Sequence, residues 1–289
     1  MLSINGLSKG IDMDRTTSPS TLTHIGLLAK YELTKRFSNK SGMISLIAFM
    51  LIWAILLLYP IKSASEFIML PSFKNFTEAL FGPGSLRHLF EWPVAEFAVF
   101  WLAALYLFPM FSIFIAADQF SSDKQRGSLR FLTLRVSRTS LFFGRFLGQM
   151  LIQFMLIILT LLATIALASS RDISLLLPSI TTSLLVMVNL VIILLPYTAA
   201  MAVLSLQANS ARQASIFAII LWAVVSIVIA IVNMNFPQLS WLNWCLPGSQ
   251  IASLINTQGL SSLALAPIPL LQTAVILFVG KVLMSRSAL

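Results

Sequence analysis

The chain has 289 residues, of which 58% are hydrophobic and only 10% are charged, and its formal net charge is +9. Soluble domains are about 45–50% apolar and about 25% charged. This composition therefore excludes an ordinary soluble domain and predicts an all-α polytopic membrane protein. Cys245 is the single cysteine, and the two histidines, His24 and His88, lie far apart. We therefore expect no intrachain disulfide, no metal site and no catalytic centre built on histidine.

The N-terminal part of the chain precedes the first long apolar run. Residues 1–21 are rich in small polar residues and predict a mobile tail. In residues 22–40, apolar side chains recur at steps of three and four, with Lys30, Lys35 and Arg36 between them. This pattern predicts a basic amphipathic helix on the membrane surface, and an ordinary solvated helix is the alternative.

Residues 41–289 contain apolar runs that approach or exceed the ~20 residues needed to cross a bilayer. They predict a transmembrane domain of about six helices. The predicted spans are 43–59, which ends before Pro60, then 94–117, 146–169, 175–206 (with Pro196 inside), 214–232 and 263–284.

The basic residues predict the orientation of these spans. Most of the 19 lie in the N-terminal region, in the loop after the second span and near the C-terminus. The other set of loops holds only Lys62, Lys74, Arg87 and Arg171. Because cytoplasmic loops carry the excess of Lys and Arg, both termini should be cytoplasmic. This distribution accounts for the net charge, so we expect no nucleic-acid partner.

Two further regions leave alternatives open. The outer loop at residues 61–93 is long enough for a short helix that contacts an external partner, or it is a solvated connector. Residues 233–259 are uncharged and contain Trp241 and Trp244, which suits re-entrant half-helices or simple anchoring at the membrane interface.

The loop between the second and third predicted spans carries the most informative pattern. Its elements are Asp118, then Asp123-Lys-Gln-Arg-Gly127-Ser128-Leu129, then Val136-Ser137-Arg138, then Gly144-Arg-Phe-Leu-Gly148. This arrangement resembles the permease subunits of type-2 ABC exporters, most closely those of the nitrous-oxide-reductase-maturation type. The chain departs from the pattern of that family at Gln125, Ser128, Arg135 and Arg145.

The resemblance implies a transport subunit of a bacterial cytoplasmic (inner) membrane that works with a separate P-loop ATPase and with a second permease copy or a related permease. The chain has no Gly-x-x-x-x-Gly-Lys-Ser/Thr element of its own. ATP and Mg²⁺ would therefore be bound by the partner, and we expect neither a cofactor nor enzymatic activity in this chain.

The same resemblance implies that the loop couples the chain to its ATPase. The residues expected to do so are Asp118, Asp123, Arg126, Gly127, Ser128, Arg130 and Arg138. The arginines would pair either with acids of the ATPase or with anionic membrane lipids. Gly144 and Gly148 form a small-x-x-x-small pair that lets two helices pack closely or only relieves crowding.

Other functions remain as alternatives. Away from their ends, the predicted spans contain no Asp, Lys, Arg or His, although ion-coupled carriers usually bury such groups. They also lack the paired carboxylates or Ser/His arrangement of an intramembrane enzyme. A secondary carrier and a membrane-embedded lipid-modifying enzyme are therefore the less favoured functions.

Overall fold

The computed structural model describes residues 21–81, 87–257 and 259–286, and these residues form helices joined by short connections. The predicted tail lies outside them, apart from its last residue. In chain order the elements are α1 (Thr21–Ser38), α2 (Lys40–Leu56), η1 (Leu57–Ile61), α3 (Lys62–Ile68), α4 (Pro71–Phe81), α5 (Arg87–Phe90), α6 (Ala95–Ile115), η2 (Ala116–Asp118), α7 (Ser121–Gln125), α8 (Ser128–Arg135), α9 (Arg138–Arg171), η3 (Ile173–Leu175), α10 (Leu176–Gln207), α11 (Ala211–Asn235), η4 (Pro237–Cys245), α12 (Ile251–Ile255), η5 (Gly259–Leu265) and α13 (Pro267–Arg286).

Within the described ranges, six helical stretches are long and apolar enough to cross a membrane. They are Gly42–Ile68, Ala95–Gln125, Arg138–Arg171, Ile173–Gln207, Ala211–Asn235 and Gly259–Arg286. The prediction of an all-α polytopic membrane protein is thereby confirmed.

The first of these stretches is longer than the sequence pattern indicated. The prediction ended the helix before Pro60, but the helix continues to Ile68. Proline lacks a backbone N–H, and its ring clashes with the carbonyl four residues earlier. Here the chain adopts one wider π turn over Leu57–Ile61, with Pro60 inside it, and such a turn accommodates the proline without ending the helix.

The helix of the third predicted span also begins earlier than expected, at Arg138 rather than near residue 146. The Ser137 hydroxyl caps it by accepting a hydrogen bond of 3.1 Å from the Ser140 backbone N–H. As a result Arg138 and Arg145 belong to the first turns of α9 and not to a loop.

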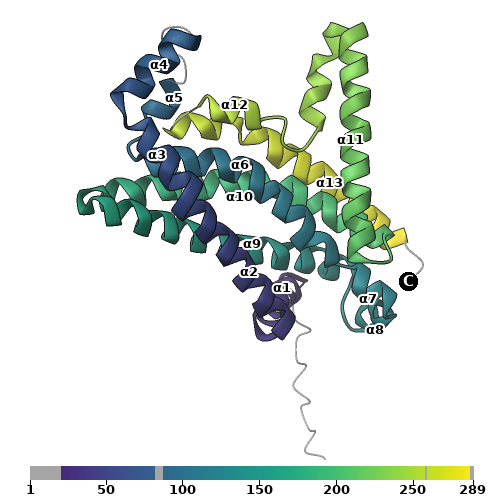
Figure 1. The fold of residues 1–289 in the computed structure, drawn as a ribbon. Helices are drawn as coiled ribbons and strands as arrows, with labels where there is room; N and C mark the ends of the chain where they lie inside the picture. The colour runs from purple at the N-terminus through teal and green to yellow at the C-terminus, as the bar shows by residue number, and fades with distance from the viewer. Residues whose placement is uncertain (1–20, 82–86, 258, 287–289) are drawn as a thin grey trace, which may run out of the picture.

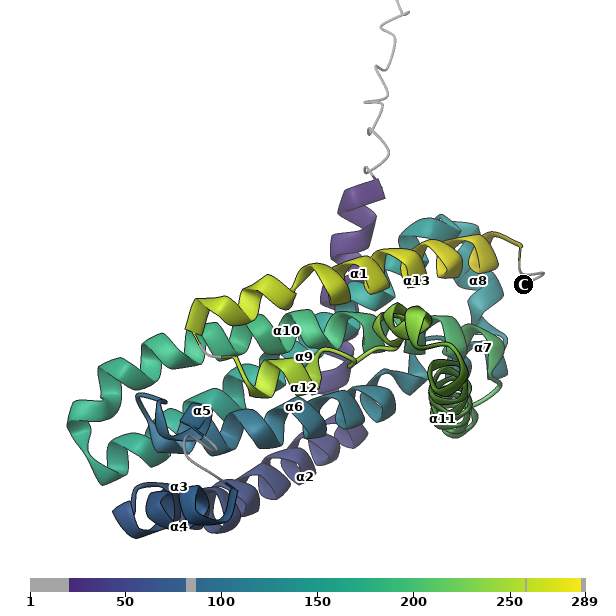
Figure 2. The same cartoon turned by 90° about the horizontal axis from the view of Figure 1, so that it is seen from above.

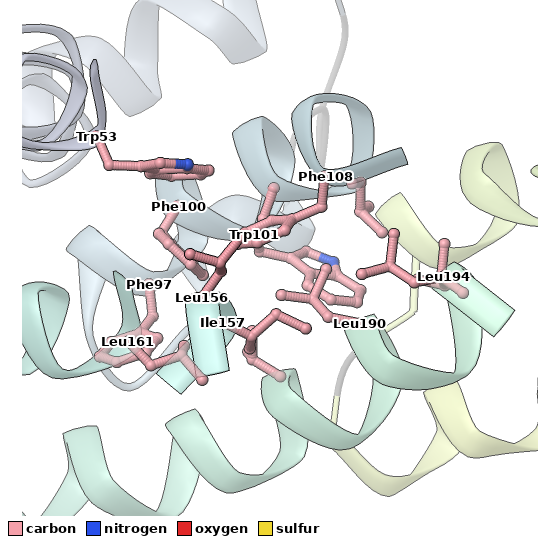
Figure 3. Close-up of a cluster of buried hydrophobic side chains, with 14 of the residues drawn as sticks. Trp53, Phe97, Phe100, Trp101, Phe108, Leu156, Ile157, Leu161, Leu190 and Leu194 are labelled. Atoms are coloured by element: carbon pink, nitrogen blue, oxygen red, sulfur yellow. The ribbon is translucent and has the colours of Figure 1, made fainter. Parts of the chain in front are cut away.

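The long helices α6, α9 and α13 pack against α10, and all four run along the length of the molecule (Figures 1 and 2). Aromatic and aliphatic side chains of α2, α6, α9 and α10 fill the space between them. Figure 3 shows Trp53, Phe100, Phe108, Ile157 and Leu190 in this buried core.

The two ends of the bundle differ. At one end, α1, α7, α8 and the C-terminal end of α13 gather; at the other lie α3, α4 and the turn between α9 and α10 (Figure 1). At the second end, Arg171 Nε lies 3.0 Å from Glu96 Oε1, which joins the end of α9 to the start of α6.

Helix α11 stands away from the bundle for most of its length, and η4 folds back beside it (Figure 1). Its fully buried residues are few, and apolar side chains such as Leu221, Val228 and Met234 are exposed. In a membrane protein these side chains face lipid or another chain.

Candidate functional site

The candidate site is the connection between α6 and α9, residues 116–137, together with the parts of the bundle that it touches. Its first residue of interest is Asp118, whose side chain is exposed. Asp118 Oδ1 accepts a hydrogen bond of 3.2 Å from the Ser122 backbone N–H and one of 3.3 Å from the Ser121 hydroxyl. A carboxylate at the first turn of a helix satisfies donors that have no partner within the helix. Asp118 therefore stabilises the start of α7.

The turn between α7 and α8 depends on Gly127. Its φ of +68° lies in the left-handed region, which glycine adopts without a steric penalty. A Cβ atom at Gly127 would meet no heavy atom within 4 Å, so the requirement for glycine comes from the backbone and not from close packing. The next residue, Ser128, donates its hydroxyl to Asp123 Oδ1 at 3.0 Å and ties α8 to α7 across the turn.

Arg145, on the first turns of α9, forms the charged centre of the site. One of its guanidinium nitrogens, Nη2, donates to Asp123 Oδ2 on α7, and Nη1 donates to the backbone carbonyl of Gln119. Its Nε lies 3.7 Å from Glu32 Oε1 on α1, which is an ion-pair distance but not a hydrogen bond. A single side chain thus joins α1, α7 and α9. We call Arg145, Asp123, Glu32, Gln119 and Phe120 the Arg145 cluster.

The Arg145 cluster is largely shielded from water. The Arg145 side chain is only 5% exposed, and its guanidinium carbon lies 5.2 Å from the centre of the fully buried Phe120 ring. A buried arginine is tolerated when carboxylates and carbonyls satisfy its donors. Removal of the Arg145 guanidinium would leave two largely shielded carboxylates, Asp123 and Glu32, without this shared partner.

Two other basic residues hold the connection to the ends of further helices. Lys124 Nζ donates to the carbonyls of Leu206 at 3.2 Å and Gln207 at 3.1 Å, at the C-terminus of α10. Arg138 Nη1 donates to the Ser285 carbonyl at 3.0 Å, near the end of α13. A cation at a helix C-terminus binds carbonyls that have no intrahelical partner and complements the negative end of the helix dipole.

Gly144 and Gly148 lie where α1 packs against α9. A Cβ atom at Gly144 would lie 2.7 Å from the Leu28 Cβ, and one at Gly148 would lie 2.8 Å from the Glu32 Cβ. Real Cβ atoms essentially never come so close, so the two glycines allow α1 to approach α9 to the distance at which Glu32 reaches Arg145.

The side of the connection that faces away from the bundle remains open. On α8, Phe131 is 71% exposed and Leu134 is 83% exposed, and Arg126 and Arg130 are exposed beside them. Leu129, on the other side of α8, is buried. The connection therefore offers an apolar and basic surface while its inner side is attached to α1, α9, α10 and α13.

A hydrogen-bonded cluster links the connection to the interior of the bundle. Gln119 Nε2 donates to the Thr198 carbonyl at 3.2 Å, and Gln153 Nε2 donates to the Thr198 hydroxyl at 2.9 Å. The Ser112 hydroxyl lies 3.3 Å from the same hydroxyl. These four buried residues come from α6, α9, α10 and the start of the connection. A displacement of Gln119 would therefore be transmitted to the transmembrane helices α6, α9 and α10.

The predicted site residues occupy distinct parts of this arrangement. Asp118, Asp123, Gly127 and Ser128 shape the connection, Arg126 and Arg130 are on its open side, and Arg138 reaches α13. Arg145 was not among the predicted site residues and was noted only as a departure from the family pattern. Its signal in the sequence is that it is the single charged residue between Arg138 and Arg171.

The chain matches a known protein family. A protein-family model described as "ABC-2 family transporter protein" matches residues 27–284. No curated protein matches the chain.

Proposed function

The chain belongs to the ABC-2 family of transporter membrane proteins, and from that premise we propose that it couples ATP hydrolysis by a separate subunit to export, or to force transmission, across the membrane. Membership in the family makes it a permease subunit of an ABC transporter. We propose the coupling to ATP hydrolysis, the direction of transport and the separate ATPase partner in addition to this membership.

The observation that carries the proposal is the construction of the α6–α9 connection. A surface that receives force must be exposed on one side and firmly attached on the other. Phe131 and Leu134 are exposed, and Lys124 and Arg145 attach the connection to the ends of transmembrane helices. An exposed aromatic side chain beside arginines, as at Phe131, is a combination enriched at protein–protein interfaces.

In the proposed mechanism, closure of two ATPase subunits around ATP displaces α7 and α8 relative to the membrane. Asp123 carries this displacement through Arg145 to α9 and, through Glu32, to α1. Gln119 carries it to Thr198, in the C-terminal third of α10. ATP and Mg²⁺ are bound by the partner in this mechanism, and this chain supplies a lever and part of the pathway.

The proposal includes the location and the assembly of the protein. We place the end of the bundle that holds α1, α7 and α8 in the cytoplasm of a bacterium, with both termini on that side, because most basic residues lie there. A second copy or a related permease completes the transporter in the membrane, and the outer loop at 61–93 is the segment available to an external partner. Kinship with the nitrous-oxide-reductase-maturation subgroup is part of the proposal too.

Co-purification in mild detergent from the native host tests the function. We expect a P-loop ATPase, identified by peptide mass, at one copy per permease. The double variant Arg130→Glu, Leu134→Glu changes two exposed residues of α8 and should abolish recovery of the ATPase. Arg130→Glu reverses a charge, and Leu134→Glu introduces a negative charge into the apolar surface. The matched control, Lys62→Glu on α3 at the other end of the bundle, should retain it.

Two outcomes distinguish the proposed function from the role of α8 as the docking surface. Absence of any ATPase from the wild-type preparation would contradict the function and favour a stand-alone carrier or enzyme. Full recovery with the α8 double variant would leave the function intact but would refute α8 as the docking surface.

A further inference from the structure

A groove of about 280 Å³ lies where the junction of α1 and α2 meets α6 and α9. Its walls are apolar along most of their length, with Leu46 and Ile52 from α2, Phe111 from α6 and Leu156 from α9. Arg36, near the end of α1, is the one charged residue among the described residues that line it. The groove thus has an apolar interior and a cation at one end.

The length of the groove corresponds to one leaflet of a membrane. Its lining on α2 extends from Gly42 to Ile52. Ten residues of α-helix rise about 15 Å, which is half of a hydrocarbon core of ~30 Å. Arg36 precedes this helix, so its guanidinium is placed at the boundary between lipid and water, where phospholipid headgroups lie.

Arg36 lacks the partner that its position on α1 would normally provide. Glu32 lies four residues earlier, at the spacing that favours an ion pair on a helix surface. However, the Glu32 carboxylate lies 3.7 Å from Arg145 Nε. Among the described residues, no carboxylate lies within ion-pair distance of Arg36, and its side chain is half-buried. A half-buried cation next to an apolar groove is complementary to an anion that carries a hydrocarbon chain.

We propose that this groove binds one anionic phospholipid, with the headgroup phosphate on Arg36 and one acyl chain between α2, α6 and α9. The volume is just below the ~300–1,000 Å³ of sites that enclose drug-sized ligands. It therefore accommodates part of a single chain, while the remainder of the lipid stays in the bilayer. The inference requires that α2 spans the membrane and does not depend on the ATPase partner.

Because of the position of the groove, a bound lipid would affect the packing of α1. It touches the end of α1, and α1 contributes Glu32 to the Arg145 cluster. Occupancy of the groove therefore stabilises α1 against the bundle, so the charge of the surrounding lipid influences how firmly the α6–α9 connection is held.

Native mass spectrometry of the purified chain tests this site. The protein is incubated with phosphatidylglycerol or with phosphatidylcholine of identical acyl chains, and retained lipid is counted. We expect the wild type to retain about five-fold more phosphatidylglycerol, the ratio expected for one cation near an anionic headgroup. Arg36→Gln should remove this preference, and Ala48→Trp, which fills the groove, should reduce retention of phosphatidylglycerol while Arg36 is still present. Arg212→Gln, a matched loss of one exposed arginine at the start of α11, should retain it.

Several results would overturn the proposal. One is equal retention of the two lipids by the wild type, and another is unchanged retention in both groove variants. Loss of phosphatidylglycerol retention in Arg36→Gln but not in Ala48→Trp would show that the headgroup contacts Arg36 while no acyl chain lies in the groove. Displacement of the lipid by excess inorganic phosphate would assign the site to a free anion. Co-purification of the ATPase with the Arg36→Gln variant is measured as described for the α8 variant. Retention of the ATPase would show that loss of the lipid is separate from the proposed function.

Discussion

Single residues of the α6–α9 connection act through charge and through backbone conformation. Arg145 is the clearest case of charge, because its side chain is only 5% exposed and contacts Asp123, Glu32 and the Gln119 carbonyl. Gly127 is the clearest case of conformation, because its φ of +68° is unfavourable for other residues although nothing occupies the space beside it. The two residues therefore predict different kinds of mutational effect.

Replacement of Arg145 by methionine should destabilise the protein by about 3 kcal/mol, since removal of one partner of a buried ion pair typically costs 3–5 kcal/mol and both acids retain some exposure. Unfolding in detergent, followed by tryptophan fluorescence, measures the loss. The variant Arg145→Lys should restore only part of it, because an ammonium group cannot reproduce the planar fork of the guanidinium.

A double-mutant cycle identifies the source of that loss. Asp123→Asn combined with Arg145→Met should cost clearly less than the sum of the two single changes, because each single change removes the same interaction. Strict additivity would mean that the two side chains do not interact in the folded protein.

Replacement of Gly127 by alanine should cost about 1–2 kcal/mol, the steric penalty of an L residue in the left-handed region. Asparagine tolerates that region better, so Gly127→Asn should be less destabilising than Gly127→Ala. The free energies of unfolding of the two variants, measured side by side, check this order. The reverse order would indicate that side-chain packing, and not backbone conformation, governs the position.

At the scale of elements, the approach of α1 to α9 decides whether the N-terminal helix belongs to the bundle. The sequence predicts α1 as a helix on the membrane surface, and the structure places it against the first turns of α9, where Gly144 and Gly148 leave room for it. This contact brings Glu32 to Arg145, so packing of the two helices and formation of the Arg145 cluster depend on each other.

Glycine-to-alanine changes in these helices should therefore have opposite signs. Alanine favours a helix by about 1 kcal/mol over glycine. At Gly26 of α1 a Cβ atom meets nothing within 4 Å, so Gly26→Ala should be neutral or stabilising. At Gly148 it would lie 2.8 Å from the Glu32 Cβ and 3.4 Å from the Ala29 Cα, so Gly148→Ala should destabilise and loosen α1.

Limited proteolysis after Lys30 and Lys35, together with the unfolding free energy, measures both variants. Faster cleavage of α1 in Gly148→Ala than in Gly26→Ala is the expected result. Equal cleavage rates would show that α1 is not held by its contact with α9.

At the scale of the whole molecule, the helices place two sets of connections at opposite ends of the bundle (Figure 1). One end contains α1, α7, α8 and the end of α13, and the other contains α3, α4 and the Glu96–Arg171 ion pair. The arrangement itself does not say which end faces the cytoplasm. The distribution of basic residues predicts that the end with α1, α7 and α8 does, through the preference of Lys and Arg for the cytoplasmic side.

Cysteine labelling in spheroplasts tests the orientation. In a Cys245→Ser background, Lys74→Cys on α4 should react with a membrane-impermeant maleimide in intact spheroplasts. Arg126→Cys, at the exposed turn after α7, should react only after lysis. Labelling in the opposite order would invert the proposed topology and would place the α6–α9 connection out of reach of a cytoplasmic ATPase.

Much of the fold was predictable because a bilayer imposes a simple rule on sequence. About 20 apolar residues are required for each span, so runs of apolar residues identify the transmembrane helices before any contact is known. The predicted helix end at Pro60 was wrong because a proline stops a regular α-helix, but a π turn within packed helices accommodates it. Whether such a turn forms depends on tertiary packing, which local sequence does not report.

The sequence by itself determined the class of protein, the number of spans and the loop that resembles its family, because composition and spacing carry that information. Only the tertiary structure decided that Arg145 joins α7, α9 and α1, since its partners Asp123 and Glu32 lie 22 and 113 positions away along the chain. Likewise, the sequence showed that Gly144 and Gly148 are four residues apart. Only the packing of α1 showed that the absence of side chains at these positions leaves room for Leu28 and Glu32. Ion pairs and close helix contacts depend on distances in space, and a linear pattern does not contain them.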